Sequence, residues 1–287
     1  MNRRNFLRAG AAGFVSLNQF PHHLFAATVA KNATDRITLG PRKIQLSRLA
    51  MGTGTRGGGG SSNQTRKLGY NGVAELFRAA YDQGVNFWDS ADQYGSHTYL
   101  REALKTVPRD KVVILTKSNS TTAAALKADI DRYRKEIGVD YIDILLMHKM
   151  EAADWPTRMR GPMDVISEAQ ERGIVRSHGV SCHTLQALQA AAAEPWVEVT
   201  LSRVNPAGLH MDADPATVLG VLRKMKQAGK GVVGMKILGQ GDLRAKTDEA
   251  LQFATAQDCL DCMTIGSESR AEFEDLLRKI PAASTRG

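Results

Sequence analysis

The sequence predicts a single α/β domain folded as a (β/α)8 TIM barrel, with an N-terminal β-hairpin that caps the bottom of the barrel. The chain has 287 residues, of which 43% are hydrophobic, and this is enough for one large core. Beyond about residue 35, eight short apolar segments alternate with amphipathic ones, which indicates a parallel sheet. Neither an internal repeat nor an obvious second domain interrupts this alternation, so closure into a barrel is favoured over an open sheet.

The predicted elements follow in order along the chain. A hairpin spans Ile37 to Leu46, with its turn at Gly40-Pro41. The eight barrel strands are predicted at residues 49–52, 86–88, 112–116, 141–147, 175–180, 197–201, 231–235 and 263–265. Apolar residues at three- and four-residue intervals predict amphipathic helices, among them those at residues 72–83, 122–137, 215–228 and 270–280.

The first thirty residues are predicted to be a twin-arginine (Tat) signal peptide, so the domains are a signal over 1–30 and a barrel over 31–287. The segment contains Arg3-Arg4 and Phe6-Leu7-Arg8, followed by a mildly apolar run to Leu17. That run lacks the roughly 20 apolar residues of a membrane span, so we expect no stable membrane anchor. The expected location is periplasmic or otherwise exported, with the Tat machinery as a partner. The alternatives are an ordinary basic N-terminus and a cytoplasmic protein.

The charge of the chain gives little reason to expect a nucleic-acid partner. The formal net charge is +8, and removal of Arg3, Arg4 and Arg8 with the signal would lower it by three. The remaining basic residues lie in short groups, and none forms the long run that is typical of a nucleic-acid arm. We therefore expect a monomer that acts on a small molecule.

Four side chains suited to proton transfer stand at the ends of three successive predicted strands. Asp89 and Tyr94 follow the second barrel strand, Lys117 ends the third and His148 ends the fourth. A barrel gathers its catalytic side chains at the C-terminal ends of its strands, so these four can meet in one pocket. Each also has an ordinary structural explanation, such as a helix cap for Asp89 or a satisfied interior histidine for His148.

The chemistry of these four groups suits the transfer of a proton to an oxygen atom. A tyrosine has a pKa of about 10, and a buried ammonium nearby favours loss of its proton, so Lys117 is expected to tune Tyr94. Asp89 is the expected counter-ion of Lys117, and His148 is expected to donate to a substrate oxygen. If hydride reaches the adjacent carbon, a cofactor must supply it, because no side chain does.

These residues and their surroundings resemble the aldo-keto reductase family. Gly84-Val-Asn-Phe-Trp-Asp-Ser-Ala-Asp-Gln-Tyr-Gly95 is similar to that family's signature, and Lys117 and His148 fall where its lysine and histidine fall. The resemblance covers about residues 36 to 280. It implies an NAD(P)(H)-dependent oxidoreductase that interconverts an alcohol and a carbonyl compound (an aldehyde, ketone or sugar), with Tyr94 as general acid and base. It further implies NADP(H) in preference to NAD(H), and no metal.

The resemblance also implies a set of cofactor contacts at strand ends and in the loops that follow them. They are Gly54, Thr55, Asp89, Ser181, Lys236, Leu238, Gly239, Gly266, Ser267 and Arg270. Residues 54, 55 and 181 are implied at the nicotinamide, and residues 236–239 at the pyrophosphate. Gly266 and Ser267, taken to open the last helix, would offer N–H groups to the adenosine phosphate, with Arg270 near its 2′-phosphate. Cys182, Leu201, Val204 and Glu272 depart from the family pattern.

Several features of the sequence have two possible interpretations. The loop Gly57–Ser62 is either a flexible substrate lid or an ordinary solvent loop. Arg203 either meets an acidic substrate or forms a surface ion pair. Cys259 and Cys262 have redox-motif spacing and can form a short-loop disulfide in an oxidising compartment. Residues 210–214 are expected to cap a helix, with a metal cluster as the alternative.

Two other classes of protein remain open from the sequence. One is a nicotinamide-binding or redox-sensing barrel protein that does not turn over substrate. The other is a different barrel enzyme, such as a lyase or hydrolase, which would need a metal cluster or paired acids at the strand ends.

Overall fold

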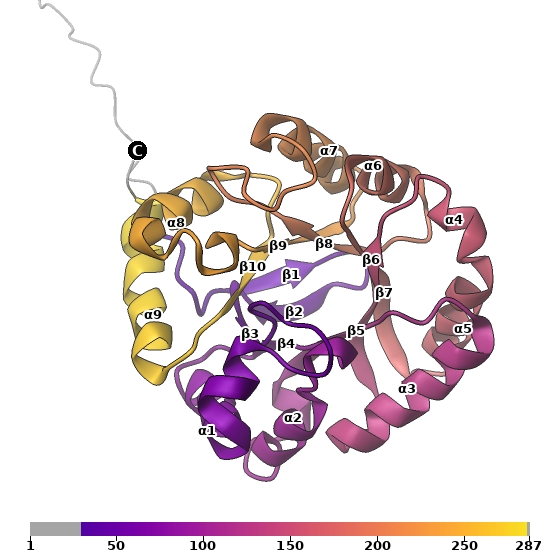
Figure 1. Ribbon diagram of the computed structural model, residues 1–287, viewed down its shortest axis with the longest axis horizontal. Coiled ribbons are helices and arrows are strands. Elements are labelled where there is room, and N and C mark those ends of the chain that lie inside the picture. The colour runs from indigo at the N-terminus through magenta and orange to yellow at the C-terminus, as the bar shows by residue number, and fades with distance from the viewer. Residues whose placement is uncertain (1–29, 286–287) are drawn as a thin grey trace, which may run out of the picture.

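A computed structural model describes residues 30–285, in which eight parallel strands close into a barrel surrounded by helices (Figure 1). Neighbouring strands pair in the order β10-β3-β4-β5-β6-β7-β8-β9. Their bounds are β3 Leu49–Gly52, β4 Phe87–Asp89, β5 Val113–Ser118, β6 Ile142–Met150, β7 Val175–Cys182, β8 Val199–Arg203, β9 Gly231–Met235 and β10 Cys262–Gly266. The predicted (β/α)8 barrel is confirmed.

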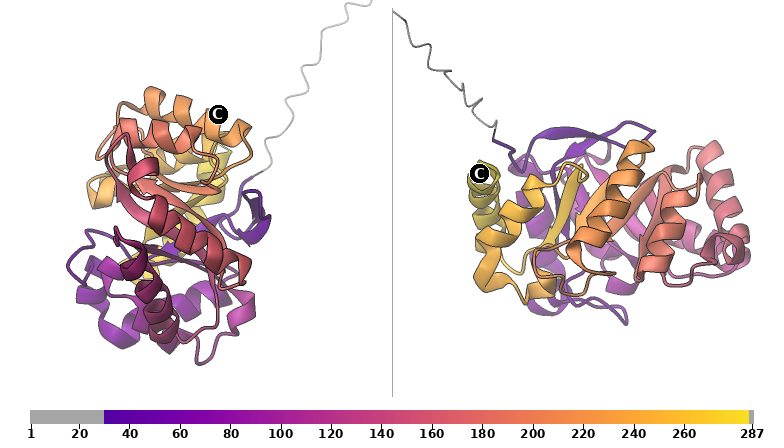
Figure 2. Two further views of the ribbon diagram at one scale, coloured as in Figure 1. Left: turned by 90° about the vertical axis from the view of Figure 1, so that its right-hand side faces the viewer. Right: turned by 90° about the horizontal axis from the view of Figure 1, so that it is seen from above.

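The N-terminal hairpin closes one end of the barrel. Its strands β1 (Arg36–Leu39) and β2 (Ile44–Ser47) pair antiparallel, and Gly40 in the turn has a φ of 60°. Figure 2 shows the hairpin lying across one end of the barrel. Leu39, Ile44 and Leu46 pack with the inward-facing side chains of the barrel strands, so the hairpin seals the end opposite the strand C-termini. The predicted hairpin is confirmed.

The helices cover the outside of the barrel and bury their apolar faces against the strands. In the described residues they are α1 (Asn63–Asp82), α2 (His97–Ala103), α3 (Ala123–Ile137), α4 (Trp155–Arg158), α5 (Arg160–Glu171), α6 (Leu185–Ala193), α7 (Pro215–Gln227), α8 (Thr247–Ala256) and α9 (Arg270–Ser284). Short 3₁₀ turns, among them η1 (Asp92–Tyr94), η2 (Arg109–Lys111), η3 (Gly239–Gly241) and η4 (Arg244–Lys246), lie in the loops.

Helix α3 shows how the local sequence sets these elements. The hydroxyl of Thr122 accepts a hydrogen bond from the backbone N–H of Ala125 and caps the start of the helix. Its buried residues lie three or four positions apart, at Leu126, Ile130, Tyr133 and Ile137, and so form one apolar stripe. Gly138 ends the helix with a φ of 79°, a conformation that glycine adopts at little cost.

Helix α1 begins nine residues before the helix predicted at 72–83. Ser62 and Thr65 form a capping box, in which each side-chain hydroxyl accepts a hydrogen bond from the backbone N–H of the other residue. Gly69, with a φ of 64°, kinks the helix and hides its periodicity in the sequence. The polar run before residue 72 therefore belongs to the helix and not to the preceding loop.

The predicted Tat signal over residues 1–30 lies almost wholly outside the described residues, and it stays a prediction. Within residues 30–285, a search for a helix both long and apolar enough to cross a membrane finds none.

Candidate active site

The four residues predicted to form a proton-transfer group meet at the C-terminal ends of β4, β5 and β6. Asp89 is the last residue of β4, and Tyr94 ends the turn η1 that follows it. Lys117 forms an ion pair with Asp89 and donates a hydrogen bond to the Ser90 carbonyl at 2.6 Å. The rings of Tyr94 and His148 meet edge-on, with 5.8 Å between their centroids. The barrel thus brings together residues 59 positions apart in sequence, which is 148 minus 89.

The Lys117–Asp89 ion pair lies inside the barrel and is held by further hydrogen bonds. The second carboxylate oxygen of Asp89 accepts from the hydroxyl of Thr264 on β10 at 2.9 Å. Burial lowers the pKa of Lys117, and the Asp89 carboxylate opposes that change. Thr264 was not predicted as part of the site, because its role depends on where the last strand lies beside the first ones.

The environment of Tyr94 differs from the one expected from the sequence. Burial raises the pKa of Tyr94, and the charge of Asp89 raises it further. The Lys117 ammonium lies over the Tyr94 ring, 4.9 Å from its centroid, instead of bonding to the hydroxyl. The expected lowering of this pKa is therefore not found. Tyr94 stays protonated at neutral pH, which is the form a proton donor needs.

Tyr94 and His148 differ from Lys117 and Asp89 in their hydrogen bonding. Among the described residues, none hydrogen-bonds to the Tyr94 hydroxyl or to either ring nitrogen of His148. The Nδ1 atom of His148 is buried, and burial, with a smaller effect of the Lys117 charge, holds the pKa of this histidine far below its usual value. His148 is therefore neutral at pH 7 and keeps one N–H donor.

Two glycines support the ring of Tyr94. A Cβ atom on Gly54 would come within 2.4 Å of the ring, and a Cβ on Gly57 would do the same on another edge. The loop that contains Gly57 is fastened to η1, because the Gly60 N–H donates to the Gln93 carbonyl at 2.9 Å. The loop Gly57–Ser62 therefore has a role that neither sequence interpretation included, which is to hold the tyrosine in place.

Replacing Gly57 with alanine is expected to displace the Tyr94 ring and to lower kcat/KM for a reaction that uses the Tyr94 proton by about 10²-fold, the cost of a shift near 1 Å. Gly58→Ala is the matched control, because a Cβ at Gly58 meets nothing within 4 Å and neither glycine has a positive φ. Steady-state kinetics and thermal unfolding of both variants measure the effect. Equal activity in the two variants would show that the loop does not position Tyr94.

A continuous groove leads away from Tyr94 along the strand ends. The groove has two parts, which meet around Leu238 and Arg244. The first part is lined by Gly52, Gly54, Thr55, Asp89, Tyr94, Leu201, Met235, Lys236, Ile237, Gln240, Gly241 and Thr264. The second part is lined by Thr247, Ser267, Glu272, Asp275, Leu276 and Lys279. Both parts share Leu238, Arg244, Ile265 and Gly266, so they form one groove.

Seven of the ten residues implied as cofactor contacts line this groove, and three do not: Ser181, Gly239 and Arg270. Gly239 is buried inside the turn η3. Ser181, at the end of β7, is also buried, and its hydroxyl accepts from the Lys149 N–H at 3.0 Å. Ser267 lines the second part of the groove, and its buried hydroxyl has no hydrogen-bond partner among the described residues. An unpartnered buried hydroxyl at this position suits a polar ligand.

Two details of the adenosine end predicted from the sequence are wrong. Gly266 ends β10, and α9 begins only at Arg270, so Gly266 and Ser267 do not open the last helix. The cause is Ser269, whose hydroxyl accepts from the Glu272 N–H at 3.1 Å and caps the helix three residues later. Arg270 lines neither part of the groove and pairs with Glu274 on the same helix.

The cations that line this end of the groove are Arg244 and Lys279. Arg244 lies in the turn η4 and pairs with Glu268 at 2.7 Å and with Glu272 at 3.7 Å. Lys279 comes from the third turn of α9 and pairs with Asp275. The sequence shows no pattern that selects Arg244, because its loop has neither strand nor helix periodicity.

The contacts of Arg203, Asp214 and the two C-terminal cysteines decide three alternatives that the sequence left open. Arg203 forms an ion pair with Asp212, but the pair is buried and not on the surface. Asp214 caps α7 by accepting from the Thr217 N–H at 3.0 Å, as expected of that loop. Cys259 and Cys262 are buried free thiols, so the suggested disulfide is not formed, and burial raises the pKa of both.

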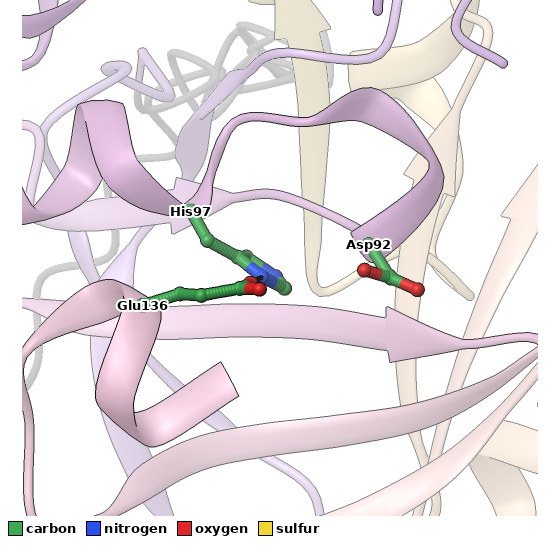
Figure 3. A group of neighbouring side chains, drawn as sticks. All are labelled: Asp92, His97 and Glu136. Atoms are coloured by element: carbon green, nitrogen blue, oxygen red, sulfur yellow. Dashed lines mark hydrogen bonds and ion pairs between the residues drawn. The ribbon is translucent and has the colours of Figure 1, made fainter. Parts of the chain in front are cut away.

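One cluster of possible metal ligands, Asp92, His97 and Glu136, lies beside the site in the described part of the chain (Figure 3). Both ring nitrogens of His97 already have partners, Glu136 at 2.8 Å and Thr116 at 2.7 Å. Arg132 donates to Asp92 at 2.8 Å and to Glu136 at 3.0 Å. The Arg132 guanidinium thus supplies the positive charge between Asp92 and Glu136, so the cluster is an ion-pair network that links η1 to α3.

Comparisons with known proteins place these features in a family. The sequence model described as "Aldo/keto reductase family" matches residues 48–281. The chain is 26% identical over 171 residues to the NADH-specific methylglyoxal reductase of Escherichia coli, which is 51% of each chain. It is 23% identical over 212 residues to the D-threo-aldose 1-dehydrogenase of a Pseudomonas species, covering 62% of this chain and 63% of that protein.

The fold has solved counterparts as well. An aldo-keto reductase from Bacillus halodurans in its holo form superposes with a TM-score of 0.70 at 15% identity, over 86% of this chain and 91% of that one. The chain spans about half the length of the curated relatives it matches.

Proposed function

The chain belongs to the aldo/keto reductase family, and from this we propose that it is an NAD(P)(H)-dependent oxidoreductase that interconverts a carbonyl compound and an alcohol. The substrate class is an aldehyde, a ketone or a sugar. The observation that carries the proposal is the Tyr94 hydroxyl, which has no protein partner among the described residues and stands at the head of a continuous groove. A proton donor at the end of a long groove suits a reaction between a small substrate and an extended cofactor.

In this proposal each of the four predicted residues has one task. Tyr94 donates its proton to the carbonyl oxygen during reduction and accepts one during alcohol oxidation. Neutral His148, whose ring lies beside Tyr94, donates a hydrogen bond to the same oxygen and orients it. Lys117, fixed by Asp89, places its positive charge over the tyrosine ring and stabilises the tyrosinate that forms. The nicotinamide supplies the hydride.

The groove accounts for how the cofactor would be held. Gly54 and Thr55 lie beside Tyr94, at the position that suits the nicotinamide. Lys236 and the loop after β9 line the middle of the groove, where a pyrophosphate needs positive charge. Arg244 and Lys279 line the far end, and we propose that these two cations favour NADP(H) over NAD(H) by binding a 2′-phosphate.

Titration of the full chain with NADPH and NADH, followed by nicotinamide fluorescence, tests this proposal. We expect both to bind, with NADPH about tenfold tighter, the effect of one hydrogen-bonded charge pair. Arg244→Met should remove the preference without abolishing NADH binding. Turnover of aldehydes, ketones and sugars is then measured with the cofactor that binds.

The same titration has a pH dependence that reports on Lys236. Burial, with a smaller effect of the Arg203 charge, lowers the pKa of Lys236 to about 8. The ammonium form, which attracts a pyrophosphate, is therefore present below about pH 8 and is lost above it, so NADPH affinity should fall as the pH rises from 7 to 9.5. Lys236→Met should flatten this profile.

The possible outcomes separate the candidate functions. Absence of binding by both dinucleotides would sink the reductase. Binding without turnover of any carbonyl or alcohol would instead favour a nicotinamide-binding or redox-sensing protein on the same barrel.

A further inference from the structure

Four basic side chains stand at the ends of four consecutive barrel strands, on the face that holds Tyr94. Lys149 lies near the end of β6, His183 follows β7, Arg203 ends β8 and Lys236 follows β9. These strands are neighbours in the order β6-β7-β8-β9, so the four residues form a continuous arc, here named the basic arc.

The basic arc lies directly beside the proton-donating residues. The rings of His148 and His183 meet edge-on with 6.4 Å between their centroids. His148 also contacts Tyr94, so it lies in contact with both residues. Burial lowers the pKa of both histidines most, and the positive charges around them, including those of Lys149 and Lys236, lower it further. A substrate with its carbonyl oxygen at Tyr94 and His148 therefore has the arc within a few atoms.

The positive charge of the arc is only partly neutralised within the protein. Arg203 is paired with the buried Asp212, but Lys149 reaches only Glu151, at 3.9 Å, and that glutamate is exposed. The half-buried ammonium of Lys236 makes neither a hydrogen bond nor an ion pair with any of residues 30–285. A half-buried cation without a partner is costly, and an anion that binds there removes that cost.

The backbone fixes the two lysines in an unusual conformation. Lys149 has a φ of 60° and Lys236 a φ of 55°, in the left-handed region that residues with a Cβ rarely occupy. Of the six non-glycine residues in that region among the described ones, only Lys43 lies in the hairpin at the opposite end. Lys149 is the penultimate residue of β6, and the other four lie in segments that follow a strand C-terminus. Such strain collects at functional sites, where the surrounding structure holds a side chain in a required direction.

We propose that the basic arc binds an anionic group of the substrate, a carboxylate or a phosphate ester, a few atoms away from the carbonyl. Lys149 supplies the charge and neutral His183 a hydrogen bond, because His183 lies against His148 and neither residue lines the dinucleotide groove. Lys236 lines that groove and serves the cofactor, while its charge and that of Arg203 add to the attraction. The substrate class is then an oxo acid or a phosphorylated aldehyde. This inference rests on the proposed oxidoreductase function.

Matched pairs of substrates test the proposal. Butanal and 4-oxobutanoate have the same chain length and differ in the carboxylate, and glyceraldehyde and glyceraldehyde 3-phosphate differ in the phosphate. In the full-length protein we expect kcat/KM for an anionic member to exceed that of its neutral partner by about tenfold or more, the effect of one charge-assisted hydrogen bond. A preference confined to one pair identifies whether the carboxylate or the phosphate is bound.

Two variants show whether the preference comes from the arc. Lys149→Met should reduce the ratio between anionic and neutral members by about tenfold. Lys127→Met is the matched control, because Lys127 is an exposed lysine on the outer helix α3 and its removal changes the net charge equally. If Lys149→Met is poorly folded, Lys149→Gly replaces it, since glycine accepts a φ of 60° without strain.

A measurement without turnover separates this inference from the proposed function. Succinate should raise the thermal unfolding temperature above that in sodium chloride of equal ionic strength, and Lys149→Met should lose this rise. Turnover with equal kcat/KM for anionic and neutral members overturns the inference and leaves the reductase standing. If no carbonyl is turned over, the succinate effect decides: a rise that depends on Lys149 supports the anion site although the reductase fails, and its absence overturns both.

Discussion

Tyr94→Phe is expected to leave dinucleotide binding intact while carbonyl reduction falls about 10²–10⁴-fold, the range that a positioned proton donor supplies. The change removes one oxygen atom from a ring that is held by Gly54, Gly57 and the edge of His148. The hydroxyl has no hydrogen-bond partner in the described part of the protein, so its removal leaves no buried group unsatisfied. Loss of activity is then a chemical effect and not a consequence of unfolding.

The measurement is kcat and KM for the substrates that the carbonyl screen identifies, together with thermal unfolding. Tyr70→Phe is the control, because it also removes a phenol hydroxyl but from an exposed residue on α1. Full activity of Tyr94→Phe would assign the proton transfer to another group and remove the main support for the proposed mechanism.

The location of the four central residues could be predicted because strand ends in a barrel share one face. Asp89, Lys117 and His148 each end an apolar segment, and the closed order of β4, β5 and β6 brings them together. The rule needs only the strand positions, and the predicted strands agree with the observed ones to within three residues at each end. Sequence patterns were therefore sufficient for this part of the site.

The remaining parts depend on distances in space that the sequence does not contain. Thr264 bonds to Asp89 across 175 residues, and Gly57 matters because the Tyr94 ring occupies the space that a Cβ would need. Arg244 lines the groove from a turn without periodicity. The pKa of Tyr94 is raised by burial and, to a smaller extent, by the charge of Asp89, and a sequence does not give the relative size of such effects.

Lys117→Met is expected to lower the free energy of unfolding by about 3–5 kcal/mol, because it leaves the Asp89 carboxylate buried without its counter-ion. Methionine fills a volume similar to that of lysine, so the loss arises from charge and not from a cavity. The remaining hydrogen bond from Thr264 cannot replace an ammonium. Urea unfolding followed by tryptophan fluorescence measures the effect, and Trp88, next to Asp89 on β4, is a nearby reporter.

The double variant Asp89→Asn/Lys117→Met distinguishes the two functions of this ion pair. Asparagine is neutral and can still accept from Thr264, so the double variant should regain most of the stability that the single variant loses. Lys117→Met and the double variant should both have low activity, because the positive charge over the Tyr94 ring is absent in both. Recovery of activity together with stability would mean that the pair serves only to hold the fold. Recovery of stability alone would show that the buried Lys117 ammonium is needed for the chemistry of Tyr94 and not for the stability of the fold.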